Sequence, residues 1–161
     1  MKKITILLFL ISSFLFPNSL KLSSKDIFIL KKIKSVTNDK QMQYTLMALC
    51  IKESSVGKFM ISKTNDYGLF QANIKTVLSR QKVKDTRANR KYFANKLIND
   101  VAFSTANAII ELEYWQKVHK GKWGRTWASY NTGWRYKSPA GKRFASSVFK
   151  IIKKLKYEYR L

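Results

Sequence analysis

The stretch QMQYTLMALCIKES, residues 41–54, sets the expectation for the fold, because its apolar side chains recur at helical spacing. We expect a helix that begins after Asn38-Asp39 and ends near Ser54. One face of this helix carries the apolar residues Met42, Leu46, Leu49 and Cys50. Glu53 lies on the same face. A carboxyl group there is partly removed from water, which raises its pKa and suits a general acid.

The alternative for Glu53 is a surface role. At the last turn of the helix its side chain could face water and pair with Lys52 or Lys58. The helix pattern by itself leaves both readings open.

The rest of the chain is expected to be mainly α-helical. Helices are predicted from Ser24, over Val101–Val118 after a capping Asp100, and from Gly141 as an amphipathic helix. Residues 62–71 carry turn formers, so a small irregular or β element is predicted there.

Two further segments are predicted to lack long helices. Residues 79–91 are basic and polar, which is typical of a loop or a short solvated helix. A short segment over residues 126–130 is predicted to lead into a turn at Asn131-Thr132-Gly133.

The composition of the 161 residues indicates one compact domain with an anionic partner. Hydrophobic residues make up 45%, and 32 Lys and Arg against 9 Asp and Glu give a formal charge of +23. Nucleic acid, anionic lipid and the bacterial cell wall would all satisfy that charge. Cys50 and His119 are single, so no intramolecular disulfide, zinc site or other cofactor is expected. His119 lies among lysines and is predicted to be a solvated surface residue.

The first 19 residues have the pattern of a secretory signal. Lys2 and Lys3 precede an apolar run from Ile4 to Phe16, which Pro17 ends. The run is short for a membrane span, which needs about 20 apolar residues. We therefore expect a signal peptide over residues 1–19, export to the periplasm or cell-wall space, and no stable membrane insertion after cleavage. An uncleaved anchor or a first buried helix is the alternative.

Three short motifs follow one another along the chain. Glu53-Ser54 is followed by Ser62, then by Gly68-Leu69-Phe70-Gln71, and later by Ser129-Tyr130-Asn131. Their order and spacing resemble the soluble lytic transglycosylase family, which has Glu-Ser, Gly-Leu-Met-Gln and Ala-Tyr-Asn at these places. The resemblance covers roughly Tyr44 to Val148.

The resemblance implies a single lysozyme-like, α-rich domain, here over residues 20–161, that cleaves peptidoglycan. It implies that Glu53 protonates the bond between N-acetylmuramic acid and N-acetylglucosamine. Glu53 would then act as a base, so that a 1,6-anhydro sugar forms. It also assigns substrate contacts: Ser62 would bind a sugar substituent, Gln71 and Tyr130 would line the cleft, and Asn131 would support that loop.

Three positions depart from the family pattern. Phe70 replaces the usual Met, Ser129 replaces Ala, and Phe144 stands where a Tyr is common. The loss of the tyrosine hydroxyl at Phe144 bears on rate more than on the type of reaction.

Asp66 keeps a second reaction open. A glycoside hydrolase generally needs two carboxylates, whereas an enzyme whose nucleophile belongs to the substrate needs one. Asp66-Tyr67-Gly68 is also similar to the Asp-Tyr-Gly string of animal-type lysozymes, in which the Asp is the second catalytic carboxylate. A turn-capping role for Asp66 is favoured, which leaves Glu53 as the single catalytic carboxyl.

Other classes of function are weaker. A non-catalytic peptidoglycan-binding or secretion-apparatus component would keep the cleft without turnover, and Glu53 and Gln71 argue against it. A nucleic-acid-binding protein would use the basic run Arg80 to Lys91, yet the signal pattern makes cell-wall carboxylates the nearer anion. We expect a monomer that acts on glycan strands and serves a secretion or conjugation apparatus or a phage.

Overall fold

The fold is mainly α, as predicted. A computed structural model describes residues 20–161, so the predicted signal at residues 1–19 lies outside the described residues. The helices are α1 (Ser24–Lys34), α2 (Lys40–Ser54), α3 (Ile74–Arg80), α4 (Arg87–Asn99), α5 (Val101–Val118), α6 (Trp123–Thr132), the 3-10 helix η1 (Gly133–Arg135) and α7 (Pro139–Tyr157). Two short antiparallel strands, β1 (Asp66–Tyr67) and β2 (Ala72–Asn73), pair Asp66 with Asn73. They form the small β element expected within residues 62–71 and extend it by two residues.

Side-chain caps set the helix boundaries that the sequence predicted. The carboxylate of Asp39 accepts from the Met42 amide at 2.7 Å and begins α2. Ser55, in the left-handed region at φ 50°, ends it. The carboxylate of Asp100 accepts from the Phe103 amide at 2.9 Å, so α5 begins at Val101 as predicted.

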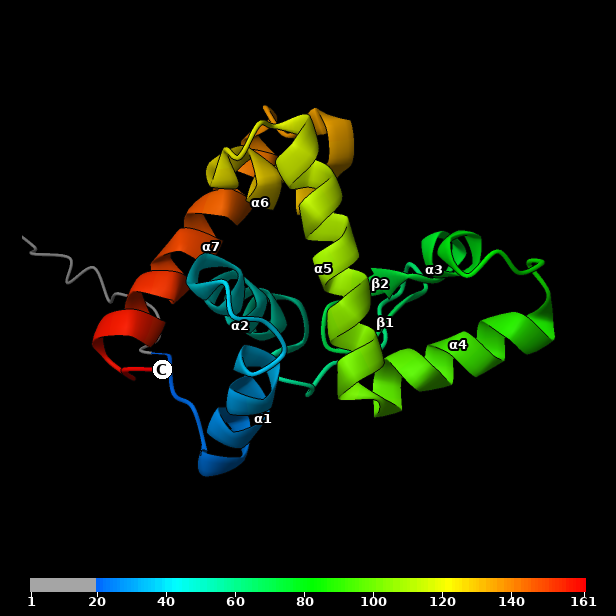
Figure 1. Ribbon diagram of the computed structural model, residues 1–161, viewed down its shortest axis with the longest axis horizontal. Coiled ribbons are helices and arrows are strands. Elements are labelled where there is room, and N and C mark those ends of the chain that lie inside the picture. The colour runs from blue at the N-terminus through cyan, green and yellow to red at the C-terminus, as the bar shows by residue number, and fades with distance from the viewer. Residues whose placement is uncertain (1–19) are drawn as a thin grey trace, which may run out of the picture.

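Helix α5 stands between two groups of elements (Figure 1). On one side α1, α2 and α7 share the larger core, to which Leu46, Leu49 and Val148 belong. On the other side α3, α4 and the two strands form a smaller lobe. Helix α6 packs against both α5 and α7. The end of α2 contacts the loop between β1 and β2, where the Ser54 hydroxyl donates to the Leu69 carbonyl.

The prediction for residues 79–91 was wrong in part. Helix α3 ends at Arg80 and helix α4 already begins at Arg87, so only residues 81–86 form a loop. The two helices share a second core, made by Ile74, Val77, Leu78, Phe93, Ala94 and Leu97. Those apolar residues flank the basic run, and their packing makes its two ends helical.

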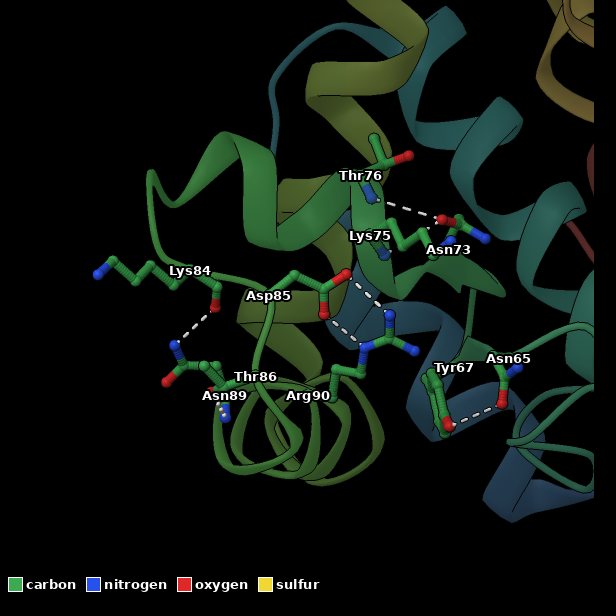
Figure 2. A network of polar contacts seen from close by, with 10 residues as sticks. All are labelled: Asn65, Tyr67, Asn73, Lys75, Thr76, Lys84, Asp85, Thr86, Asn89 and Arg90. Carbon is green, nitrogen blue, oxygen red and sulfur yellow. Dashed lines mark hydrogen bonds and ion pairs between the residues drawn. The ribbon is translucent and has the colours of Figure 1, made fainter.

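Polar contacts fix the turn between α3 and α4, as Figure 2 shows. The guanidinium of Arg90 binds the Asp85 carboxylate, with Nη2 to Oδ2 at 2.8 Å. The Asn89 side chain donates to the Lys84 carbonyl at 2.8 Å, and the Thr86 hydroxyl caps α4. The side chains of Arg90 and Asp85 are 42% and 44% exposed, so their contact orders the turn more than it stabilises the fold.

Two later boundaries also differ from the sequence prediction. Helix α6 runs from Trp123 to Thr132, so Asn131 and Thr132 are helical and the turn begins at Gly133. Helix α7 starts at Pro139 instead of Gly141, because the Ser138 hydroxyl caps it and proline is favourable in the first turn.

The prediction of a solvated His119 was wrong. Its side chain is buried at 5% exposure, stacks on the Trp115 ring and hydrogen-bonds the Ser129 hydroxyl at 2.7 Å. Burial, and secondarily the charge of Arg125, lower the pKa of this histidine. The serine that replaces the usual alanine at position 129 therefore satisfies a buried imidazole.

Candidate active site

A cleft of about 280 Å³ opens beside the end of α2 and brings together residues from four helices and the hairpin. Its lining consists of Glu53, Asp66, Gln71, Ala72, Asn73, Thr76, Arg80, Asn107, Glu111, Tyr130 and Asn131. Four residues that the resemblance singled out, Glu53, Gln71, Tyr130 and Asn131, are among them, together with Asp66. Ser62 is not among the lining residues.

Glu53 is a half-buried carboxyl in this cleft. Burial raises its pKa to about 7; the charge of Lys52 lowers it, and the neighbouring Asp66 raises it. Within residues 20–161 no hydrogen bond or ion pair engages the carboxyl, and Lys58 lies 3.8 Å from Asp26 instead. A carboxyl with this pKa carries a proton in a large share of molecules near neutral pH, as a general acid must.

The loop opposite Glu53 is held by backbone and side-chain hydrogen bonds. The Ser54 hydroxyl donates to the Leu69 carbonyl at 2.8 Å, next to the Gly68 amide that donates to the Met60 carbonyl at 2.8 Å. The Gln71 amide group donates to the carbonyls of Phe59 and Gly68, each at 3.0 Å. These contacts fix where the Gln71 side chain enters the cleft.

Tyr130 joins the third motif to this loop. Its hydroxyl donates to the Phe70 carbonyl at 3.0 Å, and burial and the nearby Glu53 raise the pKa of the phenol. Tyr130 is thus neutral and keeps a fixed place beside Glu53. Asn131 follows on the same helix and is exposed at the cleft.

Asp66 and Ser62 make a turn network at the cleft's edge. One carboxylate oxygen of Asp66 accepts from the hydroxyls of Ser62 and Thr64, at 3.0 and 2.5 Å. The other accepts from the Asn73 side chain at 2.9 Å. The Ser62 hydroxyl in turn accepts from the amides of Thr64 and Asp66. Both side chains are therefore engaged in forming the hairpin.

The sequence analysis missed the far end of the cleft. Arg80 of α3 pairs with Glu111 of α5 and also donates to the Asn107 carbonyl at 3.2 Å. The sequence predicts a loop or a short solvated helix for residues 79–91, which contain Arg80. Asn107 and Glu111 lie one turn apart on α5, but that helix also carries Ser104, Thr105 and Glu113, so their spacing alone does not mark the pair.

The cleft continues past Glu53 on its other side. A hollow of about 490 Å³ lies between α2 and α7 and shares Glu53 and Asn131 with the first cleft. Lys52, Arg143 and Phe144 are among its other lining residues. Glu53 and Asn131 therefore border both hollows.

The tryptophans near the third motif have different positions. Trp127 is buried and donates to the Thr45 hydroxyl at 3.2 Å, and Trp123 packs against the larger core. Trp134, in contrast, is 67% exposed.

Neither a metal site nor a spanning helix is found in the described part of the chain. Within residues 20–161 no three His, Cys, Asp or Glu side chains gather as around a metal ion. Within the same residues, no helix is long and apolar enough to cross a membrane.

These features define a class of protein: a helical domain whose polar cleft holds a carboxyl with a raised pKa, suited to acid/base chemistry. Residues 32–152 match the family model described as the transglycosylase SLT domain, and the chain belongs to this family. Domains of this family are generally those of lytic transglycosylases and are related to lysozymes in fold.

A curated relative comes from Enterobacteria phage T4 and is described as "Uncharacterized 20.7 kDa protein in vs-regB intergenic region". It is 36% identical over 118 residues, which cover 70% of this chain and 62% of the relative. The match thus spans less than two thirds of the relative's length. No solved structure gives a significant match.

Proposed function

We propose that this protein is a lytic transglycosylase that cleaves the β-1,4 bond between N-acetylmuramic acid and N-acetylglucosamine and leaves a 1,6-anhydro-muramic acid end. The observation that carries the proposal is the Glu53 carboxyl, free of hydrogen bonds and ion pairs within the described residues, with its pKa raised by burial to about 7. Family membership supplies the substrate class.

Glu53 performs both proton transfers. Its carboxyl proton passes to the glycosidic oxygen as the bond from that oxygen to C1 of the muramic acid breaks. The C6 hydroxyl of the same sugar then attacks C1, and its proton returns to Glu53. The carboxyl is regenerated, no water is consumed, and no second carboxylate is required.

The surrounding residues position the sugar. Gln71 and Tyr130, whose side chains are fixed by carbonyl groups of the facing loop, line the cleft beside Glu53, and Asn131 borders both hollows. The resemblance gives Ser62 a contact with a sugar substituent. The Ser62 hydroxyl is already hydrogen-bonded to Thr64 and Asp66. It would contact a sugar only after the turn rearranges; otherwise Ser62 contributes by holding Asp66 in place.

A hydrolase that uses Glu53 and Asp66 is the second candidate, favoured by the presence of both carboxyls in one cleft. Against it stand the three side chains that donate to Asp66, namely Ser62, Thr64 and Asn73. These hydrogen bonds hold the Asp66 carboxylate in the turn and occupy its lone pairs, which makes it a poorer nucleophile.

Mass spectrometry of muropeptides released from purified sacculi tests the proposal. The protein should release products one water lighter than hydrolysis products, Glu53→Gln should release none, and Asp66→Asn should release the same anhydro products more slowly. Full-mass reducing ends that disappear in Asp66→Asn would establish the hydrolase. Sacculus binding without any products would leave a non-catalytic binding component.

We further propose that the protein works as a monomer outside the cytoplasm, where it opens the wall locally. A secretion or conjugation apparatus is one setting, and the phage origin of the T4 relative supports a phage setting as another. Sedimentation analysis of the purified protein and cell fractionation of a tagged chain test the two parts of this statement.

A further inference from the structure

One side of α7 carries positive charge along most of its length. The helix contains six Lys and Arg residues and no Asp or Glu, and its cap Glu158 follows at the end. Its buried side, which includes Phe144 and Val148, belongs to the larger core. At 3.6 residues per turn, the opposite side spans about 100° around the helix axis and presents five exposed residues. These residues, called here the outer face of α7, are Lys142, Phe149, Lys150, Lys153 and Tyr157.

Two side chains of the outer face are large aromatics. Phe149 is 52% exposed and Tyr157 is 74% exposed. The Phe149 ring packs beside the Trp127 ring, with centroids 6.5 Å apart, so one edge is held while the other faces water. A helix face that only has to be solvated needs no aromatic side chains. Aromatic residues among lysines are instead typical of surfaces that rest at a membrane interface.

A shallow pocket adjoins the outer face where α7 begins. It has a volume of about 300 Å³ and lies between α6 and α7, and Lys142 belongs to both the pocket and the outer face. Arg125 and Lys137 also line it, each about 6 Å from the centre of the Tyr136 ring, and none of its lining residues is acidic. An aromatic floor with three cations around it suits an anionic group that carries an apolar chain, such as a lipid phosphate.

The shape of this surface favours a bilayer over other anionic partners. Residues 142–157 extend about 22 Å along one helix, and α7 lies on the side of the molecule away from α3 and α4 (Figure 1). The exposed side of a single helix can rest on a flat surface along its whole length. Single-stranded nucleic acid, in contrast, is usually bound in a groove lined by stacking aromatics.

We propose that the outer face of α7 docks the protein on a membrane surface that contains anionic phospholipid. The lysines attract the charged surface, Phe149 and Tyr157 enter the headgroup layer, and the pocket beside Lys142 takes a lipid phosphate. The helix stays folded on its core, so this contact is peripheral. It uses neither Glu53 nor the cleft, and it therefore stands apart from the proposed function.

Vesicle cosedimentation of the full chain tests the docking surface. The vesicles contain phosphatidylglycerol and phosphatidylcholine in equal parts, and pure phosphatidylcholine vesicles measure any binding that needs no anionic lipid. Replacing Lys142, Lys150 and Lys153 by Gln together should weaken binding to the anionic vesicles roughly tenfold or more. The matched control replaces Lys82, Lys84 and Lys91 of the small lobe by Gln. It removes an equal exposed charge and should change binding by roughly twofold at most.

Single variants test the aromatics and the pocket separately. Tyr157→Ala should weaken binding roughly threefold, whereas Tyr92→Ala, at a 56% exposed tyrosine of α4, should not. Arg125→Gln should weaken it more than Arg87→Gln, an exposed arginine at the start of α4. Circular dichroism checks that every variant keeps its helical content.

Three results would overturn the proposal. Equal losses in the two triple variants would assign the binding to net charge. No preference of the wild type for anionic vesicles would exclude lipid docking. Unchanged vesicle binding in the α7 triple variant, with affinity lost for purified sacculi or for single-stranded DNA, would assign the outer face to that polymer instead.

Discussion

The hydroxyl of Ser54 donates to the main-chain carbonyl of Leu69 at 2.8 Å, which joins the last turn of α2 to the loop that carries Gln71. The same hydroxyl accepts from the Gly57 amide at 3.0 Å and is fully buried. Glu53 precedes this serine, so the contact fixes the distance between the acid and the loop that faces it. In the proposed mechanism, the acid Glu53 is thus followed directly by the residue that positions it.

Replacing Ser54 by alanine should destabilise the protein. Ser54→Ala removes the buried donor to Leu69 and the acceptor of the Gly57 amide, at a cost of about 1–3 kcal/mol in the free energy of unfolding. Urea denaturation measures it. Ser146→Ala, at an exposed position of α7, is the control and should change stability by less than about 0.5 kcal/mol. Equal stability of the two variants would show that the contact does not hold the loop.

Gly68 should not tolerate a side chain. Its φ is +84°, and a Cβ atom there would lie 2.3 Å from the Leu97 carbonyl oxygen of α4. Gly68→Ala therefore combines backbone strain with a clash against main chain, and we expect a loss of about 3 kcal/mol or more. Gly124→Ala is the matched control, because its Cβ would meet nothing within 4 Å in α6. Thermal unfolding should rank it at or above the wild type.

Short-range signals allowed the sequence to predict much of this fold. Asp39 and Asp100 cap the helices that directly follow them, and the apolar face of α2 is visible in the spacing of its own residues. The starts of α2 and α5 were therefore predicted correctly. The gathering of Glu53, Gln71 and Tyr130 in one cleft followed from the family resemblance, because a single sequence contains no information on which distant motifs meet.

What the sequence could not predict depends on long-range packing. The basic run, residues 79–91, carries no apolar pattern of its own. Its ends are helical because residues on either side of it, such as Val77 and Phe93, pack together in one core, and the local sequence does not show that contact. His119 was read as solvated because its burial depends on Ser129, which follows ten positions later on another helix. The Arg80–Glu111 pair joins two helices, and no local pattern marks it.

The raised pKa of Glu53 implies a cost in stability above neutral pH. The folded protein binds the Glu53 proton more tightly than the unfolded chain, since its pKa is about 7 against an ordinary 4.5. Between these two values the free energy of unfolding falls as the pH rises. Glu53→Gln removes this cost and should stabilise the protein at pH 8 by on the order of 1–3 kcal/mol.

Unfolding at two pH values measures that effect. At pH 4 the carboxyl is mostly protonated in both states, so Glu53→Gln and the wild type should have closely similar stability. A gain of the same size at pH 4 and pH 8 would assign the effect to packing, and no gain at pH 8 would contradict the desolvation of Glu53.

Lys52 should set the alkaline limit of activity. Its charge is the main influence that lowers the pKa of Glu53, so Lys52→Gln should raise that pKa above about 7. The protonated acid then persists to higher pH, and the decline of kcat/KM on the alkaline side should move upward. Digestion of sacculi across pH 6–9 measures this movement. Lys40→Gln, at the start of the same helix, removes an equal charge far from Glu53 and should leave the profile in place. Because Lys52 is exposed, the difference between the two variants should shrink in high salt. A profile that moves equally in both variants would assign the effect to the protein's overall charge instead of Lys52.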